Sequence, residues 1–128
     1  SPTTPAISVL YALEVQLAHM ISEGMPARWA RHVEMADATS AWVDKMRTSG
    51  VGLEMVAPAG CRSPAVSTIR TPEGVTGPDV TRGVAERGWL VGGGYGKLKA
   101  STFRIGHMGE KTMGELNAVL DVLTEVLR

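Results

Sequence analysis

The fold is decided by Val91-Gly-Gly-Gly-Tyr-Gly96 and, after a short spacer, Thr102-Phe-Arg-Ile-Gly-His-Met-Gly109. The first stretch is a glycine-rich turn, and the second predicts a strand over residues 102–106. Side chains alternate between the two faces of a strand, so Phe103 and Ile105 share one face and Arg104 occupies the other. An unpaired charge is costly at a partly buried site. With the apolar pair facing the core, we interpret Arg104 as a carboxylate-binding group.

The segments before this strand predict three more strands and a helix. Gly52 to Val56 and Ala65 to Arg70 are expected strands, the second because it is rich in Val, Thr and Ile. Thr76-Gly-Pro-Asp79 predicts the start of a helix, since proline and an acidic residue suit the first turn, and Gly88 is expected to end it. A short strand is expected from Trp89 to Val91.

Two long helices are expected before these strands. The first runs from Ile7 to a stop at Gly24, with Ser8 as its N-cap, and the second begins at Pro26 and ends near Gly50. The apolar stripe of the first helix is Leu10, Leu13 and Leu17. The expected inward stripe of the second is Trp29, Val33, Ala36, Ser40 and Val43. The charged residues expected to be solvated on the other face of the second helix are Arg28, Arg31, Glu34, Asp37 and Lys45.

The C-terminal segment predicts a final helix. Thr112-Met-Gly-Glu115 has the pattern of a capping box, in which the two polar side chains satisfy the first backbone N–H groups. The order is therefore two long helices followed by β-β-α-β-β-α. Partial segregation of strands and helices favours an α+β fold, a sheet with its helices on one face.

Composition narrows the class of function. The chain has 128 residues, and Lys plus Arg and Asp plus Glu both total 13, so its formal net charge is zero. A nucleic-acid partner or a membrane surface would favour a basic face, so we expect neither. One cysteine, Cys61, excludes an internal disulfide and is typical of a cytoplasmic protein. His19 and His32 have no partner at metal-ligand spacing, so no metal site is expected.

The glycine-rich turn could be mistaken for a phosphate-binding loop. Such a loop leads from a strand into the N-terminus of a helix, whose dipole helps to bind phosphate. Here the run is followed by Lys97-Leu-Lys-Ala-Ser101 and then by another strand. A turn that lets the backbone approach a ligand closely fits this pattern better.

Three stretches together resemble class V pyridoxal-phosphate aminotransferases of the alanine–glyoxylate and serine–pyruvate type. They are the glycine turn with the Arg104 strand, Thr3-Thr-Pro-Ala-Ile-Ser-Val-Leu-Tyr-Ala-Leu13, and Glu23-Gly-Met-Pro-Ala-Arg-Trp-Ala-Arg-His32. The match covers essentially the whole chain in order. It implies the C-terminal part of a fold-type I enzyme, with residues 1–24 as the end of the large domain and connecting helix and residues 25–128 as the small domain.

The resemblance also implies roles for two residues. Arg104 corresponds to the arginine that binds the substrate carboxylate, and Thr3 to the threonine that contacts the cofactor phosphate of the neighbouring subunit in a dimer. The implied reaction transfers an amino group from a small amino acid such as alanine or serine to a 2-oxo acid such as glyoxylate or pyruvate, with pyridoxal 5'-phosphate as cofactor. The implied partners are these substrates, the large domain and a second copy of the parent enzyme.

One expected residue is missing from the pattern. The family's Schiff-base lysine lies upstream in the large domain, and Lys45, Lys97, Lys99 and Lys111 lack its context. We therefore expect no catalytic residue in this chain and no turnover by the chain alone.

Three hypotheses stay open. The chain is a C-terminal domain of an aminotransferase, an independent module that binds a carboxylate without catalysis, or a structural domain in which Arg104 has an internal acidic partner. The first predicts an exposed leucine stripe on the N-terminal helix, and the third predicts a carboxylate within reach of Arg104.

Overall fold

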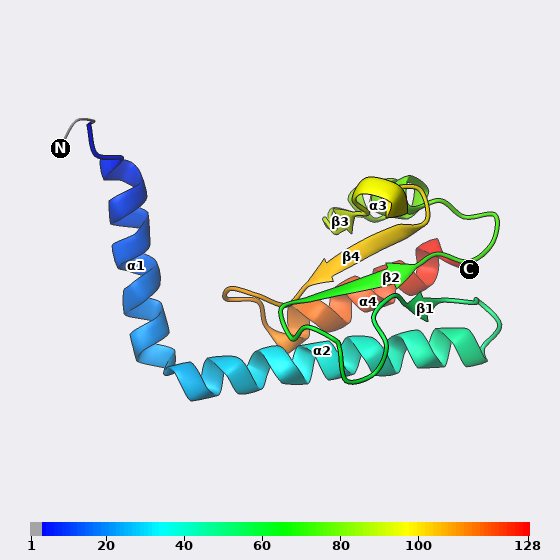
Figure 1. Ribbon diagram of the computed structural model, residues 1–128, viewed down its shortest axis with the longest axis horizontal. Coiled ribbons are helices and arrows are strands. Elements are labelled where there is room, and N and C mark those ends of the chain that lie inside the picture. The colour runs from blue at the N-terminus through cyan, green and yellow to red at the C-terminus, as the bar shows by residue number, and fades with distance from the viewer. Residues whose placement is uncertain (1–3) are drawn as a thin grey trace. The chain divides into compact units, whose positions relative to one another are not determined.

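The computed structural model describes residues 4–128 and confirms the predicted order of elements (Figure 1). The helices are α1 (Ile7–Glu23), α2 (Met25–Thr48), α3 (Gly77–Ala85) and α4 (Met113–Val126), with a short 3-10 helix, η1 (Gly96–Leu98). The strands are β1 (Glu54–Met55), β2 (Val66–Arg70), β3 (Gly92–Gly93) and β4 (Thr102–Gly106). The chain forms two compact units, residues 1–31 and 32–128.

Helix α1 dominates the first unit. Its N-cap is Ala6, which makes no side-chain cap bond, so the expectation that Ser8 caps this helix is wrong. Gly24 ends the helix as expected: it has φ of 82° and donates its N–H to the Met20 carbonyl at 2.9 Å. The predicted leucine stripe is exposed, because Leu10, Leu13 and Leu17 keep about half of their surface accessible.

The charged residues near the start of α2 differ from the expectation of a fully solvated face. Arg28 is only 6% exposed, and its Nη1 lies 2.7 Å from Glu23 Oε2. Arg31 also contacts this carboxylate, with its Nη2 2.7 Å from Oε1. Two guanidinium groups therefore converge on Glu23, and their burial is compensated by this pairing.

The second unit contains a four-stranded antiparallel sheet in the order β1-β2-β4-β3. The long central pair, β2 and β4, aligns Ser67 with Ile105 and Ile69 with Phe103. These residues are buried and share one face, whereas Arg70 and Arg104 are exposed and belong to the other. The sheet therefore has one face covered by the core and one open face.

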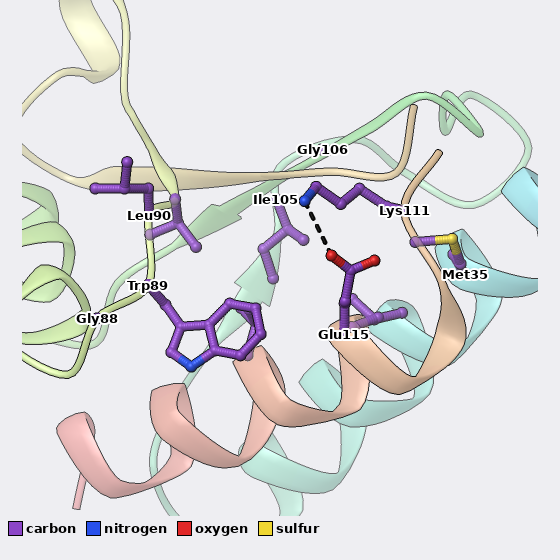
Figure 2. A pocket seen from close by; sticks show the side chains of 11 residues that line it. Met35, Gly88, Trp89, Leu90, Ile105, Gly106, Lys111 and Glu115 are labelled. Carbon is purple, nitrogen blue, oxygen red and sulfur yellow. Dashed lines mark hydrogen bonds and ion pairs between the residues drawn. The ribbon is translucent and has the colours of Figure 1, made fainter. Parts of the chain in front are cut away.

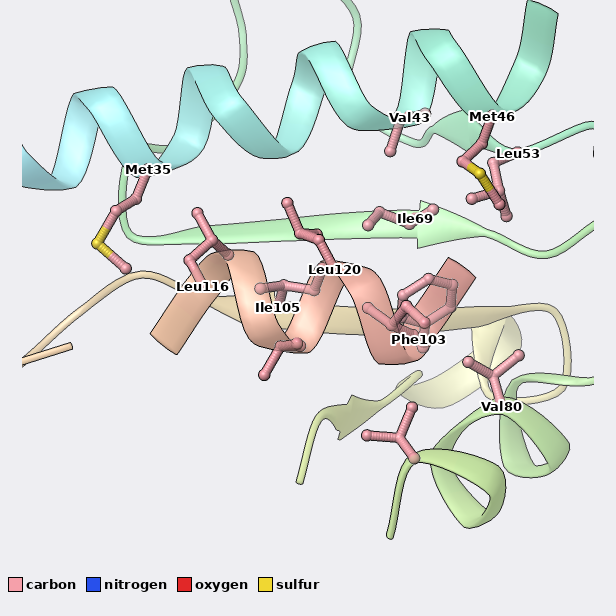
Figure 3. Packing of buried hydrophobic residues seen from close by; sticks show 13 residues of the cluster. Met35, Val43, Met46, Leu53, Ile69, Val80, Phe103, Ile105, Leu116 and Leu120 are labelled. Atoms are coloured by element: carbon pink, nitrogen blue, oxygen red, sulfur yellow. The ribbon is translucent and has the colours of Figure 1, made fainter. Parts of the chain in front are cut away.

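The core fills the covered face. It combines inward residues of β2 and β4 with buried side chains from α2, α3 and α4 (Figure 3). Phe103, Ile69, Val80 and Leu123 are completely buried. This arrangement confirms the predicted α+β fold, a sheet whose helices lie on one face.

The inward stripe of α2 was only partly predicted. Val43 is buried as expected, but Trp29 and Val33 are 60% and 48% exposed. In the second unit, Val43 shares the buried face of this helix with three residues that were not predicted: Met35, Thr39 and Met46. Thr39 belongs to the inward face because its hydroxyl donates to the Met35 carbonyl at 2.9 Å and also meets His107 Nε2 at 3.1 Å.

The predicted position of the third strand is also wrong. The sequence predicted it at Trp89 to Val91, but pairing with β4 occurs at Gly92 and Gly93, opposite Arg104 and Phe103. A Cβ at Gly92 would lie 3.4 Å from Arg104 Cβ, which is ordinary van der Waals contact, so Gly92 lies directly beside Arg104.

Candidate carboxylate site

Arg104 lies in the middle of β4, on the open face of the sheet. Its neighbours in the strand, Phe103 and Ile105, are 0% and 4% exposed and belong to the core. Thr68 of β2 lies opposite Arg104 on one side, and Gly92 of β3 on the other. The predicted division of the strand, with its apolar pair inward and its arginine outward, is confirmed.

The Arg104 side chain is held by the glycine turn. Its Nε donates a hydrogen bond to the Gly93 carbonyl oxygen at 2.7 Å. A Cβ built at Gly92 would lie 3.5 Å from that same Nε, at ordinary contact distance. The turn thus brings its backbone close to the Arg104 side chain, whereas the predicted close approach to a ligand stays a prediction.

No internal acidic partner of Arg104 is present among residues 4–128. The ion pairs found in this part of the chain are formed by other arginines and by a lysine, and none of them includes Arg104. The structural hypothesis required such a partner, so it is not supported within the described residues. The N–H groups on Nη1 and Nη2 are available to an external carboxylate, which guanidinium binds through two parallel hydrogen bonds.

The connection from the turn to β4 is fixed on Thr102. This residue is completely buried, and its Oγ1 donates to the Leu98 carbonyl at 2.8 Å. The Gly94 N–H donates to the Thr102 carbonyl at 3.1 Å. Sequence reasoning missed both Thr102 and the Gly93 carbonyl, because neither a lone threonine nor a backbone oxygen has a sequence signal.

The other residues considered from the sequence do not join Arg104. Lys97 and Lys99 are exposed on the connection, and Cys61 is exposed in its loop. Thr3 lies outside the described residues. Residues 4–128 contain no group of three or more His, Cys, Asp or Glu side chains arranged to hold a metal, and none of their helices is long and apolar enough to cross a membrane.

A separate pocket of about 330 Å³ lies on the covered side of the sheet (Figure 2). Trp89, Val91 and Ile105 are among its apolar lining residues, and Lys111 and Glu115 form an ion pair of 3.1 Å beside it. Ile105 faces the core, whereas Arg104 faces the open side, so this pocket and the carboxylate site are on opposite faces.

Comparison with known proteins shows what the chain is similar to. No family model matches the chain. An aminotransferase from Methanocaldococcus jannaschii is 36% identical over 111 residues, which cover 85% of this chain and 27% of that protein. The small subunit of a soluble hydrogenase from Synechococcus is 30% identical over 128 residues, 99% of this chain and 32% of that protein.

A solved structure agrees with the sequence comparison. The crystal structure of an alanine–glyoxylate aminotransferase from Nostoc superposes with a TM-score of 0.85 at 30% identity, covering 98% of this chain and 33% of that one. In both sequence and fold the chain is similar to one part of these aminotransferases, which agrees with the resemblance to class V pyridoxal-phosphate aminotransferases stated from the sequence. It spans about a third of the length of the relatives that it matches.

Proposed function

We propose that this chain supplies the substrate-carboxylate arginine, Arg104, to a pyridoxal-phosphate-dependent aminotransferase. The observation that carries the proposal is the open-face guanidinium of Arg104, which is held at Nε by Gly93 at 2.7 Å and has no carboxylate partner among residues 4–128. A guanidinium held in this way is ready to bind an anion, and the similarity to aminotransferases supports an amino-acid or 2-oxo-acid carboxylate as that anion.

The chemical contribution of Arg104 is orientation. Two parallel hydrogen bonds to a planar carboxylate fix the plane of the bound substrate as well as its position. This orientation selects which bond at the α-carbon is presented for reaction. Lysine offers a single point charge in place of the planar pair of donors, so it could hold the substrate without fixing its plane.

The cofactor belongs to the longer enzyme in this proposal. Pyridoxal phosphate, when bound, withdraws electrons from the α-carbon of the amino acid. The described residues do not by themselves build a site for it: Lys45, Lys97, Lys99 and Lys111 are all exposed. Their exposure supports a Schiff-base lysine outside these residues and an isolated chain without turnover.

The proposal includes an organisation and a reaction. Residues 1–24 are assigned to the end of the large domain and its connecting helix, and residues 25–128 to the small domain. The parent enzyme is proposed to be a homodimer in which Thr3 contacts the phosphate of the neighbouring subunit's cofactor. Its reaction passes an amino group from alanine or serine to glyoxylate or pyruvate.

Replacement of Arg104 in the holoenzyme tests this function. Removing one partner of a buried charge pair costs about 2–5 kcal/mol, so Arg104→Ala should lower kcat/KM at least about thirtyfold, with a raised KM for both substrates. Arg104→Lys should restore only part of this loss. The control is Arg82→Ala, since Arg82 is an exposed α3 residue paired with Asp79. Unchanged kinetics in Arg104→Ala would refute the carboxylate role.

The alternative function is a stand-alone module that binds a carboxylate without catalysis, favoured by the same unpaired guanidinium. Two measurements separate the functions. An intact mass of the source protein well above that of 128 residues supports the aminotransferase, and a native 128-residue product supports the module. Titration of the isolated chain with pyruvate, followed by NMR, then tests whether it binds the anion unaided.

A further inference from the structure

The orientation of the Arg104 guanidinium depends on one backbone oxygen. Arginine on an open sheet face has many rotamers available, and fixing one of them costs conformational entropy. Here the Nε donor is committed to the Gly93 carbonyl at 2.7 Å. Since Nε is occupied, a carboxylate meets the end of the guanidinium, where Nη1 and Nη2 each offer an N–H.

The position of that oxygen depends in turn on the next residue, Gly94. Its N–H donates to the Thr102 carbonyl at 3.1 Å, which extends the pairing of β3 with β4 by one residue. A Cβ at Gly94 would lie 2.4 Å from Thr102 Oγ1 and 2.5 Å from the Leu98 carbonyl oxygen. Only glycine therefore allows the turn to close this tightly against Thr102.

Thr102 holds the other end of the same closure. Its hydroxyl donates to the Leu98 carbonyl at 2.8 Å, which ties the residues after the turn to the start of β4. Thr102 is completely buried although it belongs to the same face as Arg104, because this connection covers it. The Thr102 hydroxyl thus fastens the turn beside Arg104 through a side-chain hydrogen bond.

We infer that Thr102 and Gly94 are positioning residues for the substrate carboxylate: they fix the Gly93 carbonyl, which directs Arg104 to bind end-on through Nη1 and Nη2. This inference rests on the proposed function. It assigns a role to a buried hydroxyl that does not itself reach the substrate, and it predicts that the effect of Thr102 on substrate binding passes entirely through Arg104.

A double-mutant cycle in the holoenzyme tests this dependence. Thr102→Val loses one hydrogen bond and should raise the KM for the amino-acid substrate about three- to tenfold. In an Arg104→Ala background the same change should leave KM unaltered, because the group being positioned is gone. Thr102→Ser, which keeps the hydroxyl, should restore wild-type KM. An equal rise in KM in both backgrounds would show a merely structural role and overturn the inference.

Matched controls come from the same connection. Thr71 is also buried, and its hydroxyl donates at 3.2 Å to the carbonyl of Ser101, the residue before Thr102, rather than to the turn residues. Thr71→Val should lower stability yet keep KM within twofold. If Thr102→Val does not fold, Gly94→Ala replaces it, with Gly106→Ala as control because the nearest atom to a Cβ there is 3.8 Å away. A KM rise in Thr71→Val as large as in Thr102→Val would also refute the inference.

A spectroscopic measurement separates this inference from the proposed function. In the 128-residue chain, the Arg104 Nε–H should give a protected ¹H–¹⁵N signal, since it is bonded to Gly93. Thr102→Val should shift this signal and speed its exchange with water, whereas Thr71→Val should not. If Arg104→Ala leaves the holoenzyme kinetics unchanged but the signal responds as expected, the proposed function fails and the positioning of Arg104 stands. If the signal does not respond, the positioning inference fails.

Discussion

His107 follows β4 directly and is completely buried. The Thr39 hydroxyl donates to the Met35 carbonyl, so the contact of 3.1 Å between Thr39 Oγ1 and His107 Nε2 requires Nε2 to be the donor. His107 Nδ1 has no hydrogen-bond partner of good geometry among the described residues. Burial lowers the pKa of His107; the Pro64 backbone opposes this effect more weakly, and the nearby His32 adds a still smaller lowering of the pKa.

This lowered pKa predicts acid sensitivity. A histidine that resists protonation in the folded state takes up its proton more readily when unfolded, so stability is full above the ordinary pKa of about 6.5 and falls as pH drops below it. The slope for one proton is at most about 1.4 kcal/mol per pH unit. We expect the unfolding free energy in urea to fall more between pH 7.5 and 5.5 in the wild type than in His107→Gln. Equal losses would contradict the prediction.

At the same scale, the sequence identified Arg104 but not what holds it. The alternation of Phe103, Arg104 and Ile105 is a local pattern that burial in the structure confirms. The Gly93 carbonyl and the Thr102 hydroxyl act through pairing of segments that meet only in the folded chain. Their roles could not be predicted because backbone oxygens are the same in every sequence.

Among the elements, helix α4 shows the most completely predicted start. Both bonds of its capping box are present: the Thr112 hydroxyl accepts from Glu115 N–H at 3.2 Å, and Glu115 Oε2 accepts from Thr112 N–H at 2.9 Å. The bond from the Thr112 backbone and the pairing with Lys111 lower the pKa of the Glu115 carboxyl. The helix start is therefore stabilised best when Glu115 is ionised.

Removal of the Thr112 hydroxyl should measure the strength of this cap. Replacing an N-cap threonine by alanine costs about 1 kcal/mol, so Thr112→Ala should lower the unfolding free energy by that amount. Thr112→Ser keeps the acceptor oxygen and serves as the matched variant. The comparison is made by urea denaturation at neutral pH, and equal stability of the two variants would show that the cap contributes nothing.

Helix α2 shows where prediction by pattern fails at this scale. The predicted inward stripe held Ser40 and four apolar residues, among them Trp29 and Val33. The true inward face includes Thr39, a polar residue whose hydroxyl is satisfied within the core. In the sequence, a buried polar residue that has hydrogen-bond partners looks the same as an exposed one. The predicted inward face therefore differs from the observed one, which includes Thr39.

On the scale of the whole molecule, residues 32–128 share one core. Phe103 is completely buried in this core and pairs across the strands with Ile69. The surrounding cluster takes residues from three helices and two strands (Figure 3). Loss of one central side chain should therefore weaken every element of this unit together.

Phe103→Ala tests this shared core. Truncating a buried phenylalanine costs about 3–5 kcal/mol through lost burial and the cavity left behind. We expect that loss in the urea unfolding free energy, with near- and far-ultraviolet circular dichroism changing at the same denaturant concentration. Leu90 is 87% exposed, so Leu90→Ala should stay within about 0.5 kcal/mol of the wild type. Separate transitions for helices and sheet would contradict a single core.

The lengths of the strands have a consequence for copies of this molecule at high concentration. Both outer strands, β1 and β3, are two residues long, and the five-residue strands β2 and β4 lie between them. A long unpaired outer strand is a template on which another chain can add its own backbone and start aggregation. Because its edge strands are so short, this sheet offers few unpaired backbone groups with which a strand of a neighbouring copy could pair. The short edges therefore protect the sheet against edge-to-edge aggregation.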